Sequence, residues 1–331
     1  MHVSLRGSLS VTLLVVLVLV IADVVWSWRT IRQIEAENPP RGTFVALDGG
    51  RIHVARRDPP GERRADVVLL HGASGNQADM MEALGAHLTA RGFRVFAVDR
   101  PGHGYSDRWP GSESPARQAQ LIRAALEGLG VHHAIVVGHS LAGAVADNFA
   151  IDHQDFASGI VMISPVSHPW PGGIAWYYST AAFGVLGGAF AYVVALPAGL
   201  AVLNTAVKSV FAPQTPPDNY IARTGAKLVL RPSKFIANAQ DVAALKAFVT
   251  QQAPRETQVH IPVAIVAGDD SDKIVFTKIH SVASAAAIPG ATLRILPGVG
   301  HAPHWANPQA IVDAVEDVFA RSTRDARGTG P

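Results

Sequence analysis

Gly138-His139-Ser140-Leu141-Ala142-Gly143 indicates the fold of this chain most clearly. An apolar run of the buried-strand type, Ala134 to Val137, precedes it, and the helical pattern Leu141 to Ile151 follows it. A strand, a sharp turn and a helix in this order present a serine hydroxyl at the end of the strand. The stretch therefore predicts Ser140 as a nucleophile, with the Leu141 N–H at the helix N-terminus as a donor to a developing oxyanion.

The turn needs small residues two positions either side of the serine. Gly138 meets this need, and Ala142 departs from a second glycine by one methyl group. A serine in such a pattern is by itself more often part of a tight turn than a nucleophile. Its position between a strand and a helix is what favours catalysis.

Strand-like and helix-like segments alternate on both sides of this turn. Asp48-Gly49-Gly50 separates two short strand-like runs and predicts a hairpin. The alternation predicts an α/β protein with one large core, in which helices cover both faces of a mostly parallel sheet. The expected strands are 44–47, 52–55, 67–70, 95–98, 134–137, 160–163, 263–266 and 293–296.

About a hundred residues interrupt the alternation after Ile163, and we expect a helical cap there, inserted before the next strand. Residues 156–207 contain no Asp, Glu, Lys or Arg, so a second membrane span is the competing interpretation. Gly172-Gly173, Gly187-Gly188, Pro197 and Gly199 are expected to divide this stretch into hairpin-sized pieces, which favours the cap. The predicted organisation is an anchor and linker at 1–41, core at 42–165, cap at 166–258, core at 259–321 and a flexible tail at 322–331.

The N-terminal stretch Val11 to Trp28 is apolar and, as a helix, would span about 27 Å, close to the hydrocarbon thickness of a bilayer. Arg29 and Arg32 follow it, so we expect a single-pass anchor that contacts membrane lipid, in the inner membrane if the source is bacterial. A cleaved signal peptide with the apolar region Leu13 to Ala22 is the alternative. The side of the membrane stays open because the flanks differ by only one or two charges.

Composition excludes several classes of protein. The net charge of +2 and the scattered arginines give no support for nucleic-acid binding. The absence of cysteine excludes a disulfide framework, thiolate metal sites and cysteine nucleophiles. No cofactor is expected. His304 lies three residues after His301, but no HExxH motif or carboxylate cluster accompanies it, so we expect no metal ion.

Two further groups that a nucleophilic serine needs follow later predicted strands. Asp270 and Asp272 come after the strand at 263–266, and His301 comes after the strand at 293–296. The order along the chain is Ser, Asp, His. In this arrangement His301 takes the proton of Ser140, and an aspartate fixes the tautomer of the imidazole and stabilises the imidazolium.

At these residues the sequence resembles the α/β-hydrolase superfamily over about residues 42–321. The motifs that carry the resemblance are His71-Gly72-Ala73-Ser74-Gly75-Asn76, Asp99-Arg100-Pro101-Gly102-His103-Gly104-Tyr105-Ser106 and Gly300-His301-Ala302-Pro303-His304. The resemblance implies that the Ala73 N–H is the second oxyanion donor beside that of Leu141, and that the insertion is the family's cap. The family's acid lies two residues before an Ile or Val, which selects Asp272, with Asp270 as the alternate.

The nucleophile narrows the reaction that this resemblance implies. Family members that open epoxides or remove halide use Asp at this position, so Ser140 argues against both reactions. Acyl transfer to water remains, and an uncharged cap favours a small ester with an apolar acyl or alcohol group. C–C bond hydrolysis, perhydrolysis and a catalytically silent binding module are the alternatives. The expected substrate-pocket residues are His71, Gly72, His139, Trp170 and Trp176.

Overall fold

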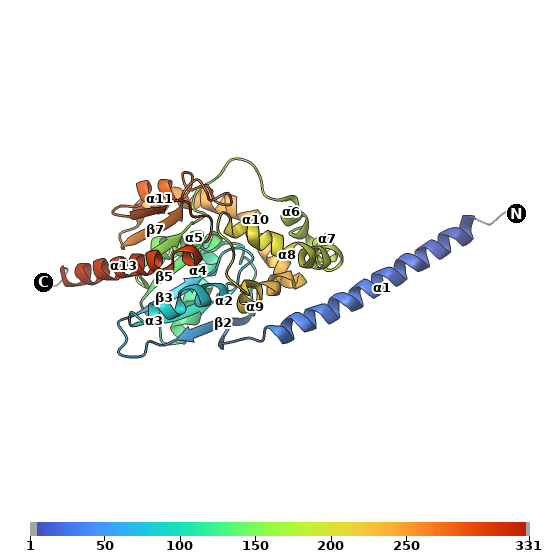
Figure 1. The fold of residues 1–331 in the computed structure, drawn as a ribbon, viewed down its shortest axis with the longest axis horizontal. Coiled ribbons are helices and arrows are strands. Elements are labelled where there is room, and N and C mark those ends of the chain that lie inside the picture. The colour runs from blue at the N-terminus through green and yellow to red at the C-terminus, as the bar shows by residue number, and fades with distance from the viewer. Residues whose placement is uncertain (1–4, 329–331) are drawn as a thin grey trace.

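The computed structural model describes residues 5–328, which are built around one eight-stranded sheet (Figure 1). The strand order is β1-β2-β4-β3-β5-β6-β7-β8. Strand β2 runs antiparallel to β1 and β4, and the strands from β4 to β8 are parallel. Each predicted strand is present: β1 (Thr43–Leu47), β2 (Gly50–Arg57), β3 (Ala65–Leu70), β4 (Phe93–Val98), β5 (Ala134–His139), β6 (Ala157–Ile163), β7 (Val263–Gly268) and β8 (Thr292–Leu296).

Helices cover both faces of the sheet because the buried strands are apolar on both sides. One core cluster joins one face to α4 and α5, through side chains such as Leu121 and Phe149. The other joins the opposite face to α2, the π-helical turn η1 and α13, through Met80, Leu84 and Ile311. The helices of the core are α2 (Gln77–Met80), η1 (Met81–Gly85), α3 (Ala86–Thr89), α4 (Pro115–Gly128), α5 (Leu141–Asp152), α11 (Ser281–Ala287), α12 (Pro303–Ala306) and α13 (Pro308–Gly328).

The segment between β6 and β7 is helical. Its elements are α6 (Trp176–Ala181), α7 (Gly184–Phe190), the π-helical turn η2 (Ala191–Ala195), α8 (Leu196–Phe211), α9 (Tyr220–Thr224), η3 (Ala226–Leu230), α10 (Pro232–Gln252) and η4 (Ala253–Gln258), where η3 and η4 are 3₁₀ turns. The expected breaks at Gly187-Gly188, Pro197 and Gly199 are wrong, because α7, η2 and α8 follow one another without interruption. Pro197 lies at the start of α8, directly after the π turn, where the missing N–H and the proline ring are tolerated.

Helix α1 (Leu5–Glu37) is longer than the predicted apolar stretch and extends away from the rest of the molecule (Figure 1). Only its C-terminal part packs on the cap: Ile34 is buried beside Leu196 and Leu228, and Ser27 Oγ donates a hydrogen bond to the Tyr192 carbonyl. Two helical stretches are long and apolar enough to cross a membrane, residues 10–37 and 186–211. A signal sequence or the core helix of a soluble protein meets the same criterion.

Helix α13 corrects the expected tail. It continues to Gly328, so residues 322–328 are helical where the sequence predicts a flexible segment. The Arg321 side chain donates to the Val263 carbonyl and pairs with Asp317 one turn earlier, and these contacts support the helix as it leaves the sheet. Residues 329–331 of the predicted tail lie outside the described residues.

Candidate active site

Ser140 lies on a strained turn between β5 and α5. Its φ of 55° and ψ of −121° are rarely adopted by a residue with a side chain. The turn is tight enough that a Cβ on Gly138 would lie 2.3 Å from the Ala142 carbonyl oxygen. Glycine is therefore required by the backbone at position 138.

His301 and Asp272 complete a chain of contacts from this serine. Ser140 Oγ lies 2.9 Å from His301 Nε2, and His301 Nδ1 lies 2.9 Å from Asp272 Oδ2. Asp272 Oδ1 accepts hydrogen bonds from the backbone N–H groups of Ile274 and Val275, both at 2.9 Å. Burial opposes ionisation of Asp272, but His301 and these two N–H groups together lower its pKa below the ordinary value. The carboxylate is thus held as an anion beside the imidazole.

The alternate acid, Asp270, is not brought to His301. Its side chain is 80% exposed, and its nearest charged partner is Lys278 Nζ, at 3.6 Å. Asp269, the preceding residue, uses its carboxylate to accept hydrogen bonds from the N–H groups of Ser271 and Gly298 within the same edge of the sheet. The geometry therefore selects Asp272 from the two aspartates.

The two N–H groups expected to form an oxyanion hole belong to elements that meet at Ser140. Leu141 is the first residue of α5, where backbone N–H groups have no partner within the helix. Ala73 lies in the loop after β3, beside Gly72, and a Cβ on Gly72 would lie 2.9 Å from Ser140 Cβ. Only glycine at position 72 lets this loop approach the serine so closely.

A cap residue holds the conformation of this loop. Ser74, next to Ala73, has a positive φ of 58°. Asn238 of α10 is fully buried; its Oδ1 accepts from the Ser74 N–H at 2.7 Å, and its Nδ2 donates to Ser74 Oγ at 3.2 Å. A left-handed non-glycine residue persists where its surroundings fix it. The cap helix therefore positions the residue that follows Ala73.

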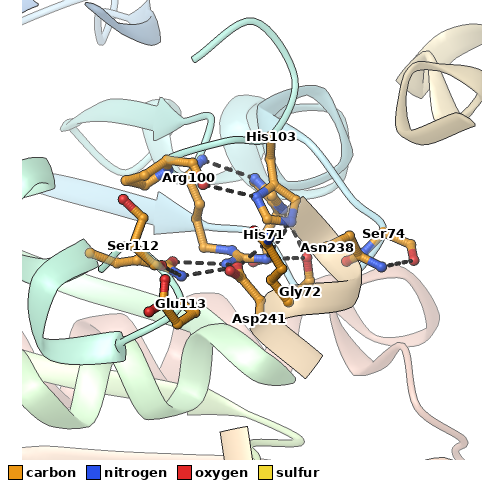
Figure 2. Close-up of polar contacts among 12 residues, drawn as sticks. His71, Gly72, Ser74, Arg100, His103, Ser112, Glu113, Asn238 and Asp241 are labelled. Carbon is orange, nitrogen blue, oxygen red and sulfur yellow. Dashed lines mark hydrogen bonds and ion pairs between the residues drawn. The ribbon is translucent and has the colours of Figure 1, made fainter. Parts of the chain in front are cut away.

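A buried arginine makes a second link between the loop and the cap (Figure 2). Arg100 is fully buried, and its guanidinium donates to the carbonyl oxygens of His71 and Gly72. The same group donates to Gln118 Oε1 and pairs with the Asp241 carboxylate of α10 at 2.9 Å. A buried charge needs a partner and satisfied donors, and this network supplies both. It ties α10 to the backbone of the oxyanion loop.

Three of the five expected pocket residues have other roles. His71 is fully buried, with Nδ1 bonded to the Gly72 carbonyl and Nε2 to the Arg100 N–H; burial and the Arg100 charge lower its pKa to about 3. His139 packs behind His301, and its Nε2 donates to the His301 carbonyl at 2.8 Å. Trp176 is 68% exposed because the loop after Trp170 leads the chain onto the cap surface. His71 and His139 thus make hydrogen bonds to backbone groups, and the Trp176 side chain is largely exposed.

The other two expected pocket residues lie near Ser140. Gly72 approaches the serine as described, and Trp170 is half-buried against Leu141, Val166 and Leu245. Sequence reasoning missed the roles of Arg100, Asn238 and Asp241. Arg100 belongs to the Asp99 to Ser106 motif, and this motif is the sequence feature that could have indicated its role. Asn238 and Asp241 follow no motif, since only the folded cap brings α10 to the loop.

Comparison with known proteins identifies the family. The model of the alpha/beta hydrolase fold matches residues 67–308, and the chain therefore belongs to the α/β-hydrolase family, as the sequence motifs predict. The chain is 26% identical over 298 residues to an uncharacterized protein of Mycobacterium tuberculosis, a match that covers 87% of this chain and 84% of the other. It is 34% identical over 119 residues to epoxide hydrolase B of the same species, of which it spans only 33%. That match covers 35% of this chain.

Solved structures share the fold as well. An esterase from Exiguobacterium antarcticum superposes with a TM-score of 0.65 at 18% identity, over 84% of this chain and 99% of that one. This likeness shows the shared fold, and membership of the α/β-hydrolase family supports a hydrolase.

Proposed function

We propose that this protein is a serine hydrolase that cleaves carboxylic esters, or related acyl compounds, with an apolar acyl or alcohol group. The observation that carries the proposal is the pair of 2.9 Å contacts that join Ser140 Oγ to His301 and His301 to Asp272. A nucleophile, a base and a group that orients the base are the parts that acyl transfer requires.

The reaction follows from the roles of these groups. His301 Nε2 removes the Ser140 proton as Oγ attacks the carbonyl carbon, and Asp272 stabilises the imidazolium that forms. The Leu141 and Ala73 N–H groups donate to the oxyanion of the tetrahedral intermediate. His301 then protonates the leaving alkoxide, and a water molecule, activated by the same imidazole, hydrolyses the acyl-enzyme.

The surroundings of Ser140 support an apolar substrate. Ser140 is only 7% exposed, and an apolar cluster that includes Leu141, Val166 and Leu245 lies beside it. Burial of apolar surface is the main source of affinity in such sites. A serine nucleophile also argues against the epoxide opening named for the partial relative, since that reaction needs an alkyl-enzyme ester.

A p-nitrophenyl ester series of increasing acyl length tests this proposal. We expect hydrolysis by the wild-type protein, with kcat/KM rising as the acyl chain is lengthened from acetate. Ser140→Ala is expected to reduce turnover to background while the melting temperature stays close to that of the wild type, because the change removes one hydroxyl from a small side chain. Full turnover by Ser140→Ala would contradict the proposal.

We further propose that α1 anchors the protein to a membrane and that the cap rests on the lipid surface. Of the apolar window in α1, 6% is buried, and for residues 186–211 the share is 22%. Large apolar side chains of the cap are also exposed, including Trp176, Phe183 and Leu186. Exposed apolar surface of this extent is typical of an interaction site. Lipid contact by α1 and the cap would bring apolar esters close to Ser140.

Carbonate extraction of membranes tests this second proposal. We expect the full-length protein to stay in the pellet, and a chain lacking residues 1–30 to be released with its activity toward p-nitrophenyl acetate retained. Partition of the truncated chain to vesicles would support lipid contact by the cap. N-terminal sequencing of the full-length product provides the control, since a mature protein that starts beyond about residue 30 would show a cleaved signal and contradict the anchor.

A further inference from the structure

Three buried side chains converge behind the imidazole of His301, and the proposed hydrolysis uses none of them. Asp79 comes from α2, His139 from the end of β5 and His304 from α12. Their exposed fractions are 7%, 6% and 1%, respectively. One ring nitrogen of each histidine and one carboxylate oxygen of Asp79 all lie within 4.8 Å of one another.

Polar atoms of this cluster lack hydrogen-bond partners. Among residues 5–328, His139 Nδ1 and both ring nitrogens of His304 are buried and make no hydrogen bond. Buried polar atoms in folded proteins are nearly always paired with protein, water or an ion. Unpaired nitrogens on two adjoining histidines, whose ring centroids are 4.3 Å apart, therefore point to a ligand that both contact.

The other polar atoms of the cluster make hydrogen bonds of the kind that orient metal ligands. His139 Nε2–H donates to the His301 carbonyl at 2.8 Å, which leaves Nδ1 with a free lone pair. Asp79 Oδ1 accepts from Tyr220 Oη–H and Trp305 Nε1–H, both at 2.9 Å, while Oδ2 accepts no hydrogen bond and has His304 as its ion-pair partner. Hydrogen bonds to a backbone carbonyl and to a ligating carboxylate are the usual means of orienting metal ligands.

The spacing of the free atoms also fits a bound ion. Asp79 Oδ2 and His304 Nε2 are 3.6 Å apart, which is too long for a hydrogen bond. Two ligands bound at about 2.1 Å to a tetrahedral ion are separated by about 3.4 Å. The observed separation is therefore close to that of two atoms bridged by a metal ion.

We propose that Asp79, His139 and His304 bind a divalent transition-metal ion, with Zn²⁺ as the best match to two imidazoles and one carboxylate. The ion would join α2, β5 and α12 beneath His301 and so stabilise the loop that carries it. This proposal departs from the expectation of no metal ion, which considered His304 only together with His301 and did not include Asp79, a residue remote from His139 and His304 along the chain.

Metal content of the wild-type protein is the first test. Protein from zinc-supplemented cultures, purified without chelator, is expected to contain about one Zn²⁺ per chain when measured by inductively coupled plasma mass spectrometry. Ser140→Ala should keep the ion, which separates this proposal from the proposed hydrolysis, and His133→Ala should keep it because His133 is exposed elsewhere. Asp79→Asn should lose it. Fewer than about 0.1 ion per chain in the wild type, or an ion retained by Asp79→Asn, would overturn the proposal.

A spectroscopic variant tests the ligand directly and keeps a ligand in place. The chain has no cysteine, so His304→Cys introduces its only thiol. After loading with Co²⁺, we expect a near-ultraviolet thiolate-to-cobalt band in His304→Cys and none in the control His133→Cys. The absence of this band in the folded His304→Cys protein would overturn the assignment of His304 as a ligand.

Discussion

Replacing Asp272 with asparagine tests the proposed relay through the geometry of a single carboxylate. The Ile274 and Val275 N–H groups both donate to Oδ1 at 2.9 Å. The asparagine oxygen must stay at that position to accept them, so the amide NH₂ takes the place of Oδ2 and faces His301 Nδ1. An amide in this orientation donates to Nδ1 and moves the imidazole proton to Nε2, which then faces Ser140 without a free lone pair.

The expected loss is large because both the tautomer and the charge are wrong. A substitution of this kind costs about 10⁴-fold in kcat, which corresponds to ~5.5 kcal/mol of transition-state stabilisation. Steady-state hydrolysis of a p-nitrophenyl ester measures it, and the melting temperature serves as the check that the variant is folded. KM is expected to change far less than kcat, since Asp272 does not touch the substrate.

Asp270→Asn is the matched control for this measurement. Asp270 is two residues away, is 80% exposed and pairs only with Lys278, so the change should alter kcat by no more than roughly twofold. An Asp272→Asn variant that keeps more than about a tenth of the wild-type kcat, or a larger loss in Asp270→Asn, would show that Asp272 does not orient His301.

Two further predictions concern the cap and a buried carboxyl pair. Asn238→Ala removes both hydrogen bonds to Ser74 and should lower kcat by about 10- to 100-fold with little change in KM, because the oxyanion loop shifts; an unchanged kcat would refute the positioning role. Burial raises the pKa of Asp147 to about 7 and that of Glu256 to about 8, whereas both titrate near 4 in the unfolded chain. Their contribution to stability is therefore full below about pH 4 and is lost as the pH rises through 7 to 8. The melting temperature of Glu256→Gln should equal that of the wild type at pH 5 and exceed it at pH 9. A difference in melting temperature that stays constant across this range would contradict the raised pKa values.

The strands, and the positions of Ser140, Asp272 and His301 at strand ends, could be predicted from the sequence because both are local features. Apolar runs mark the buried strands, and Ser140, Asp272 and His301 each follow directly after one. The spacing to Ile274, compared with the family pattern, favoured Asp272 but left Asp270 open, and the folded loop distinguishes the two. Residues that directly follow parallel strands come together in the fold because the ends of these strands meet at one edge of the sheet.

The rest of the site depends on contacts between distant parts of the chain. Asn238 contacts Ser74, and Asp79 lies close to His304, although each pair is far apart in the sequence and no periodic pattern links its members. The continuous cap helix was missed for a related reason, since the π turn before Pro197 removes the break that proline usually causes. The conformation of this segment in the folded protein therefore differs from the one that residue propensity alone predicts.

Labelling with a fluorophosphonate tests the central claim most directly, because the probe reacts only with a serine that its neighbours activate. Mass spectrometry of the digested protein should locate the label on Ser140, and the Ser140→Ala variant should not be labelled. A folded wild-type protein without label, or a label that persists in Ser140→Ala, would contradict the account.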